Sequence, residues 1–238
     1  MPEQTIHIDG IPVTLFESKK AKNLNITIKP FTGVRVSVPK GTSFRKAEDL
    51  VSGRIASVKK HLQRMKEAES GMTIFDWNSR FKTRSHELNL VQGKSDKIRS
   101  VVRDGMIRVA IPEGLEVTSG EVQTQIRRGI ERAWRKEAQE VLPGRVNVLA
   151  SENGFEFKRV TIQNARTRWG SCSQDNNINL SLHLMRLSDH LVDYVILHEL
   201  VHTRIKNHSR EFWQLLEQVC EGGRKKNSEL KIHSIQIY

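Results

Sequence analysis

The sequence predicts an α+β protein in which a basic, strand-rich N-terminal region precedes a mainly helical C-terminal region. Two observations support this class. In the first half of the chain, segments that alternate apolar and polar residues, as half-buried strands do, are followed by stretches with apolar residues at helical spacing. In the last third, an apolar helix carries two histidines one turn apart.

The composition is that of a water-soluble protein with one large domain or two small ones. Of the 238 residues, 37% are hydrophobic and 28% are charged. No run approaches the roughly 18 consecutive apolar residues of a membrane span, so we expect no membrane partner. The N-terminus lacks the basic and apolar regions of a secretory signal, and only Cys172 and Cys220 offer thiols. These features predict a reduced, cytoplasmic protein.

The positive charge is concentrated in the first part of the chain. The net charge is +12; residues 1–150 carry 27 Lys and Arg against 17 Asp and Glu, and residues 151–238 carry 12 against 10. A basic face attracts polyanions, so nucleic acid is a candidate partner of the N-terminal region. The alternative is a solvated face that only aids solubility.

Two segments of the N-terminal region have similar sequences. Residues 34–41 match residues 107–114 without a gap, and both segments end in Pro-x-Gly, which stops a strand. Strand-like residues 25–28 and 98–102 precede them, and a glycine-containing turn lies between the members of each pair. We therefore expect two β-hairpins.

A helical pattern follows each hairpin, over residues 44–69 and then over residues 122–142. The sequence thus predicts two ββα-like units, with more strand between them in residues 73–90. Pro143-Gly144 is expected to end the second helix. This places a basic N-terminal region at residues 1–142 and a second domain at residues 143–238.

The second domain is expected to begin with strands and to end with helices. The predicted strands are residues 155–162, 166–172 and 178–184, with a turn at 173–177. Ser188 is the expected N-cap of a helix over residues 189–204, and Ser209 that of a last helix reaching Gly222-Gly223.

Residues 198–202, His-Glu-Leu-Val-His, carry the chemistry. Two histidines four apart lie on one helix face, so both imidazoles can reach one metal ion, and Glu199 can hold a water bound to that ion. Five residues separate His202 from His208, which can return towards the pair as a third ligand. Three protein ligands and a water make an open, catalytic site.

The surroundings of the motif strengthen this interpretation. Residues 191–197 are apolar nearly all round, which predicts a buried helix, and buried histidines are costly unless they are paired or bind a metal. Three imidazoles favour Zn²⁺ over Mg²⁺ or Ca²⁺. If His208 is not the third ligand, Glu211 and Glu217 are the next candidates.

A cluster upstream of the motif, Arg166 to Cys172, is a candidate wall of a substrate groove. Arg168 and Trp169 could line such a groove, and an extended peptide could pair with this strand if it is an edge. On residue type alone, a core tryptophan beside solvated arginines is the simpler interpretation. Cys172 lacks a Cys-x-x-Cys partner and is not expected to bind the metal.

Together these motifs resemble the YgjP-like metal-dependent hydrolase family. The resemblance is carried by residues 168–173, 178–184, 193–202 and 207–209, with Phe212-Trp213. It implies a zincin-like catalytic domain, a metal on His198, His202 and His208, and catalysis by Glu199. It also implies that Trp169 and Ser171 line the active site. Ser181 stands where the family usually has Asn, which weakens inferences about substrate contacts from that strand.

We therefore expect a zinc-dependent hydrolase, and first a metallopeptidase acting on peptides or proteins. Glu199 would take a proton from a metal-bound water and pass it to the leaving group. Arg168, Tyr194 and His183 are unranked candidates for the oxyanion donor. The motif is similar to that of the WLM and SprT-type metalloproteases.

Two alternatives remain at this point. Some members of the resembled family are labelled UTP pyrophosphatase, so a nucleotide pyrophosphohydrolase using the same metal site is the first. The second is a nucleic-acid-associated protein whose metal is structural.

Overall fold

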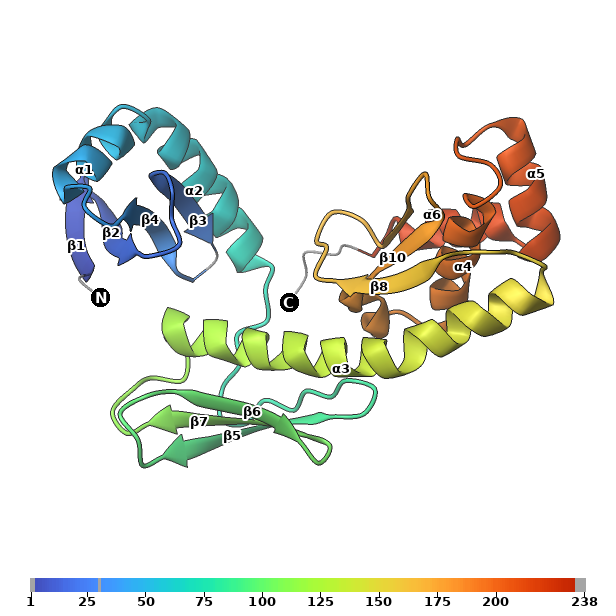
Figure 1. Ribbon diagram of the computed structural model, residues 1–238. Helices are drawn as coiled ribbons and strands as arrows, with labels where there is room; N and C mark the ends of the chain where they lie inside the picture. Colours follow the sequence, from blue (N-terminus) through green and yellow to red (C-terminus); the bar gives the residue numbers. More distant parts are fainter. Residues whose placement is uncertain (1–2, 30, 234–238) are drawn as a thin grey trace.

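The computed structural model describes residues 3–29 and 31–233. These residues form three small sheets with helices packed on them (Figure 1). The α+β class is confirmed. A long helix, α3, lies between the second sheet on one side and the C-terminal strands and helices on the other.

The first unit is a four-stranded sheet covered by two helices. Its elements are β1 (Glu3–Ile8), β2 (Ile11–Ser18), β3 (Asn25–Lys29), β4 (Gly33–Pro39), α1 (Phe44–Ser52) and α2 (Ile55–Ser70). The sheet has the order β1-β2-β4-β3. β3 and β4 form the predicted antiparallel hairpin, while β2, which the sequence analysis did not foresee, pairs with β4 in parallel.

The single helix predicted over residues 44–69 is wrong, because the chain turns between α1 and α2. The Gly53 amide donates to the Asp49 carbonyl, four residues earlier, as in an α-helix. The Arg54 amide donates to the Val51 carbonyl, only three residues earlier, as in a 3₁₀ turn. The turn lets both helices bury apolar side chains on the same sheet, with Val51 of α1 and Val58 of α2 in one hydrophobic cluster.

The second unit repeats this strand pattern. It consists of β5 (Glu87–Gly93), β6 (Arg99–Arg103) and β7 (Met106–Pro112) in the order β5-β7-β6. β6 and β7 form the second predicted hairpin, and β5 pairs with β7 in parallel, as β2 does with β4. Each predicted ββα unit therefore contains a βββα motif in the structure, β2-β3-β4-α1 in the first unit and β5-β6-β7-α3 in the second, and the first unit has β1 and α2 in addition.

Helix α3 (Gly120–Glu152) does not end before Pro143-Gly144, and that prediction is wrong. Buried Ala138, Leu142, Val146 and Leu149 keep one apolar face at helical spacing on both sides of the proline. Burial of this continuous face outweighs the backbone hydrogen bond that proline cannot donate. The division of the chain at residue 143 stays a prediction, and it falls inside this helix.

The C-terminal part contains a three-stranded sheet and four helical segments. They are β8 (Arg159–Gln163), β9 (Gly170–Cys172), β10 (Asn177–Ser181), the 3₁₀ helix η1 (Leu182–Arg186), α4 (Asp189–Val201), α5 (Arg210–Val219) and α6 (Gly223–Leu230). In the order β8-β10-β9, β10 is parallel to β8 and antiparallel to β9. β9 is therefore an edge strand.

Several predicted boundaries in this part are corrected. The predicted strands 166–172 and 178–184 shrink to β9 and β10, because the chain leaves the sheet after Ser181 and forms η1. Gly222-Gly223 begins α6 instead of ending the last helix. Ser188 and Ser209 do occupy N-cap positions, although neither makes a side-chain capping hydrogen bond.

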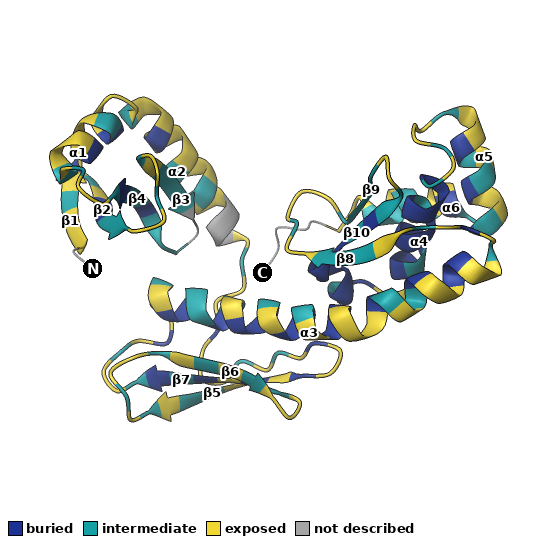
Figure 2. Cartoon of the chain, viewed as in Figure 1, coloured by how far each residue is buried: buried dark blue, intermediate teal, exposed yellow. Residues whose placement is uncertain are grey.

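Helix α4 is the centre of the larger hydrophobic cluster. It is buried along most of its length, as its dark blue ribbon in Figure 2 shows. The same cluster includes β7 and both halves of α3. Arg145 of α3 donates two hydrogen bonds of 2.7 Å to the carboxylate of Asp193, which joins α3 to α4.

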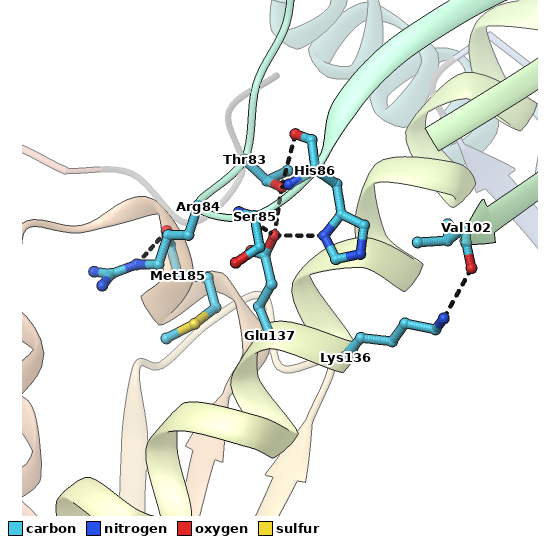
Figure 3. Close-up of polar contacts among 8 residues, drawn as sticks. All are labelled: Thr83, Arg84, Ser85, His86, Val102, Lys136, Glu137 and Met185. Atoms are coloured by element: carbon cyan, nitrogen blue, oxygen red, sulfur yellow. Dashed lines mark hydrogen bonds and ion pairs between the residues drawn. The ribbon is translucent and has the colours of Figure 1, made fainter. Parts of the chain in front are cut away.

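A polar strap also ties the second unit to α3 and to the start of α4. Buried Glu137 of α3 accepts hydrogen bonds through one oxygen from Thr83, Ser85 and His86 (Figure 3). Arg84, in the same loop, donates to the carbonyls of Met185 and Leu187 and to the carboxylate of Asp189.

None of the helices in the described part of the chain combines the length and the apolar composition that a membrane-spanning segment needs. Cys172 and Cys220 are both free thiols. The cytoplasmic location expected from the sequence stays a prediction.

Candidate metal centre

Three imidazoles converge at the C-terminal end of α4. His198 lies in the last turn of the helix, His202 is its C-cap, and His208 lies in the following loop. The Nε2 atom of His208 is 3.0 Å from that of His198 and 3.2 Å from that of His202. The structure thus brings together the three side chains that the sequence singled out. Within the described residues, no other His, Cys, Asp or Glu side chains form such a group of three.

The spacing of the three nitrogens suits a tetrahedral zinc ion. Zn–N bonds of about 2.0–2.1 Å at tetrahedral angles place two ligand nitrogens roughly 3.3 Å apart. The Nδ1 atom of His202 lies 2.9 Å from the carbonyl oxygen of Ile205. A proton on Nδ1 that is donated to this carbonyl leaves the Nε2 lone pair facing the other two rings. The donor set therefore fits a divalent transition metal.

Burial favours the neutral, metal-binding form of these rings. It lowers the pKa of His198 to about 3, with a further decrease from His202 and His208. Burial also lowers the pKa of His202, against the opposing effect of its hydrogen bond to Ile205. Imidazole binds a metal only when it is unprotonated, so the site is electrostatically prepared for a cation.

Glu199, which directly follows His198 in α4, is almost completely enclosed. Only 6% of its surface is exposed. Burial raises the pKa of this carboxyl to about 8, and the positive charge of Arg168 opposes the increase. A carboxyl group that gains and loses a proton near neutral pH is suited to general acid and base work.

The aromatic residue that packs on all three histidines is Phe212 of α5. Its ring centroid lies 4.5 Å from that of His202, 4.8 Å from that of His208 and 4.9 Å from that of His198. Phe212 is fully buried, and its contact with the three histidines was not predicted from the sequence. Its position four residues after His208, in the next helix, was the available indication.

The predicted lining residues differ in exposure. Tyr194 is buried one turn before His198, with its hydroxyl 3.5 Å from Nδ1 of that ring, and burial raises the pKa of the phenol. Trp169 is half-buried against the core and Ser171 is half-buried in β9. Arg168 is exposed.

Two further histidines and one of the alternative ligands are engaged elsewhere. His183 is hydrogen-bonded to Asn164 and packs against Trp134 of α3, while His190 pairs with Glu229 of α6. Neither belongs to the converging imidazoles. The fallback ligand Glu217 accepts hydrogen bonds from backbone amides at Gly222 and Arg224.

Comparison with known proteins was informative at the family level. The family model described as YgjP-like, metallopeptidase domain, matches residues 22–233. Crystal structures of two metallopeptidase zymogens are similar, abylysin of Pyrococcus abyssi and jannalysin of Methanocaldococcus jannaschii. They show 20% and 26% identity and TM-scores of 0.35 and 0.33, and each alignment covers 37% of this chain and 90% of the other. No curated protein matches the chain.

Proposed function

The chain belongs to the YgjP-like metallopeptidase family, and from this premise we propose that it is a zinc-dependent peptidase with a zincin-like catalytic domain. The observation that carries the proposal is the convergence of three imidazoles at the end of α4, where a buried carboxyl group, Glu199, directly follows the first of them in the chain. His198, His202 and His208 would hold the zinc. When bound, zinc supplies Lewis-acid chemistry, because it polarises a carbonyl oxygen and lowers the pKa of water.

In this proposal Glu199 is the general base. Its carboxylate accepts a proton from the attacking water and then delivers it to the leaving amine. The burial that raises its pKa to about 8 also lets the carboxyl hold the proton between the two steps. Two aromatic residues support the ligands: Tyr194 lies beside Nδ1 of His198, and Phe212 packs on all three rings.

The edge strand β9 is the proposed docking site for the substrate. Its free side offers backbone amides and carbonyls to an extended peptide, next to Glu199. Ser171 lies in this strand, and Trp169 precedes it. We propose Arg168 as the oxyanion donor, because it is exposed and its charge acts at Glu199, whereas the Tyr194 hydroxyl is buried beside His198.

The alternatives are less well supported. Enzymes that hydrolyse phosphoanhydrides more often hold Mg²⁺ with carboxylates, while this donor set is three imidazoles. Nucleic-acid binding through α3 of the basic region has little support, because three of its arginines donate to backbone carbonyls: Arg127 to Thr73, Arg132 to Ser100 and Arg135 to Ile162.

The test combines metal content with activity. Elemental analysis should find about one zinc per chain in the wild type and none in the His198→Ala/His202→Ala variant. Glu199→Gln should keep zinc and lose casein cleavage by roughly 10²–10⁴-fold, because an amide cannot accept the proton. His190→Ala, an exposed histidine of the same helix, is the matched control and should change neither. Zinc retained by the double variant, or UTP hydrolysis in place of casein cleavage, would overturn the proposal.

A further inference from the structure

Gly170, the first residue of β9, contacts the side chain of Glu199. A Cβ atom built on Gly170 would lie 2.7 Å from both Cγ and Oε1 of Glu199 and 3.0 Å from its Cδ. Such distances are far inside van der Waals contact. Gly170 is not among the glycines with positive φ, so its backbone conformation is open to alanine. The position thus requires glycine for the space that Glu199 occupies.

The strand that carries Gly170 is fixed in place by β10. Gly170 pairs with Leu180, which is fully buried, and the Ser181 amide donates to the Trp169 carbonyl at 2.8 Å. The Ser181 hydroxyl donates to the Ala165 carbonyl, also at 2.8 Å. The wall against which Glu199 packs is therefore held by several hydrogen bonds to a buried strand.

Lys206 ties the same hairpin to the loop between His202 and His208. Its ammonium group donates to the Ser173 carbonyl at 2.8 Å and to the Asn176 side-chain oxygen at 2.6 Å, and lies 3.8 Å from the Cys172 sulfur. All three acceptors belong to the end of β9 and the β9–β10 turn. Lys206 is exposed, so water competes for its ammonium group, but its charged hydrogen bonds to two acceptors of one turn join the loop to the hairpin.

We propose that the β9–β10 hairpin is the common positioning element of the site, with Gly170 and Lys206 as its two positioning residues. Gly170 sets where the Glu199 carboxyl lies, and Lys206 sets where the loop presents His208. The inference rests on the proposed roles of Glu199 and His208. It assigns the two contacts to different functions, turnover and metal retention, so each can be tested separately.

Gly170→Ala tests the first contact. It should keep zinc and leave KM little changed, while kcat on casein falls roughly 100-fold, because an ångström-scale displacement of a reacting group costs about that much. Gly144→Ala, at a helical position where a Cβ meets nothing within 4 Å, is the matched control and should be fully active. A fully active Gly170→Ala beside an inactive Glu199→Gln would overturn the inference. An active Glu199→Gln would instead overturn the proposed function.

A thermal double-mutant cycle isolates the contact from catalysis. Alanine at position 170 should lower the melting temperature when Glu199 is present and should have little effect in the Glu199→Ala protein, where the clash is removed. An equal decrease in both backgrounds would contradict the contact. If Gly170→Ala alone does not accumulate, accumulation of the double variant supports the inference, and its failure to accumulate contradicts it.

Lys206→Met tests the second contact through metal release. Loss of groups that orient a ligand typically weakens metal binding by roughly 10–100-fold, so zinc transfer to a chromophoric chelator should accelerate by about that factor. Lys225→Met, an exposed lysine of α6, is the control and should release zinc at the wild-type rate. Unchanged zinc release from Lys206→Met would overturn the role assigned to Lys206.

Discussion

The two βββα units share a topology and differ in what their helices do with it. In both βββα motifs the first strand (β2 or β5) is parallel to the third (β4 or β7), and the second strand (β3 or β6) completes an antiparallel hairpin with the third. Both third strands end in Pro-x-Gly, with Gly41 and Gly114 at the same φ of 82°. In the first unit α1 and α2 fold back on their own sheet, whereas α3 of the second unit extends beyond its sheet and packs against the site-bearing region.

The comparison shows that a repeated local pattern determines the sheet but not the role of the unit. The first unit closes its own hydrophobic cluster, from Ile8 to Val58. The second unit shares one cluster with α4, the helix that carries His198 and Glu199. A destabilising substitution in the second unit should therefore weaken zinc binding at the candidate metal centre, and one in the first unit should not. Four predictions test this difference.

The largest effect is expected for Trp134→Ala in α3. This side chain is 3% exposed and packs on Phe81 of the second unit and on His183 beside α4. Truncation of a buried tryptophan costs about 3–5 kcal/mol of unfolding free energy. Urea unfolding followed by tryptophan fluorescence should show this loss, and zinc should be released at lower urea. Zinc release at an unchanged urea concentration would contradict the shared core.

Leu15→Ala is the corresponding change in the first unit. Leu15 is 1% exposed, and its truncation should cost about 2–5 kcal/mol of that unit's stability. All four tryptophans, of which Trp77 is the first, follow this unit in the sequence. Far-UV circular dichroism should therefore show an earlier transition, while tryptophan fluorescence and zinc content stay unchanged. A parallel shift of the fluorescence transition would show that the two units unfold together.

The sequence predicted the two local hairpins better than the elements that depend on distant partners, for a physical reason. The hairpins β3–β4 and β6–β7 are local, and their alternation and glycine turns specify them directly. The partners β2 and β5 depend on parallel pairing with a later strand, which no local pattern shows. The passage of α3 through Pro143 depends on apolar surface supplied by α4, so tertiary packing overrode a sound local rule.

In the site, too, the features set by local sequence were predicted and those set by packing were not. His198 and Glu199 lie in the last turn of α4 and His202 is its C-cap, so the four-residue spacing of the two histidines alone indicated a shared target. The contacts of Gly170 and Lys206 depend on how β9 lies against α4 and on where the next loop turns back. Such contacts between elements have no periodicity in the sequence and needed the fold to be recognised.

Arg84→Met is the third prediction and tests the strap between the second unit and α4. Arg84 donates to two backbone carbonyls and to Asp189, and hydrogen bonds from charged groups contribute about 1.5–3 kcal/mol. Because its side chain is 29% exposed, we expect a loss of about 1–3 kcal/mol. The comparison in the first unit is Arg35→Met, which removes an ion pair with the exposed carboxylate of Glu3 and should cost about 0–1 kcal/mol. Equal losses of unfolding free energy in the two variants would show that the contacts of Arg84 contribute no more than a surface ion pair.

The smallest effect is expected for Gly144→Ala. Helix α3 continues through this glycine, whereas in the first unit the chain turns at Gly53, between α1 and α2. Gly144 is exposed inside α3, and its Cβ would meet nothing within 4 Å. Glycine within a helix costs about 0.5–1 kcal/mol relative to alanine, so the variant should be more stable by that amount. Gly53→Ala should give less, because Gly53 is the C-cap of α1 and lies outside the helix interior, where the helix propensity of alanine has its full effect. Calorimetry should find the melting temperature of Gly144→Ala raised by about 1–4 °C. A melting temperature below that of the wild type would mean that α3 needs this glycine to accommodate Pro143.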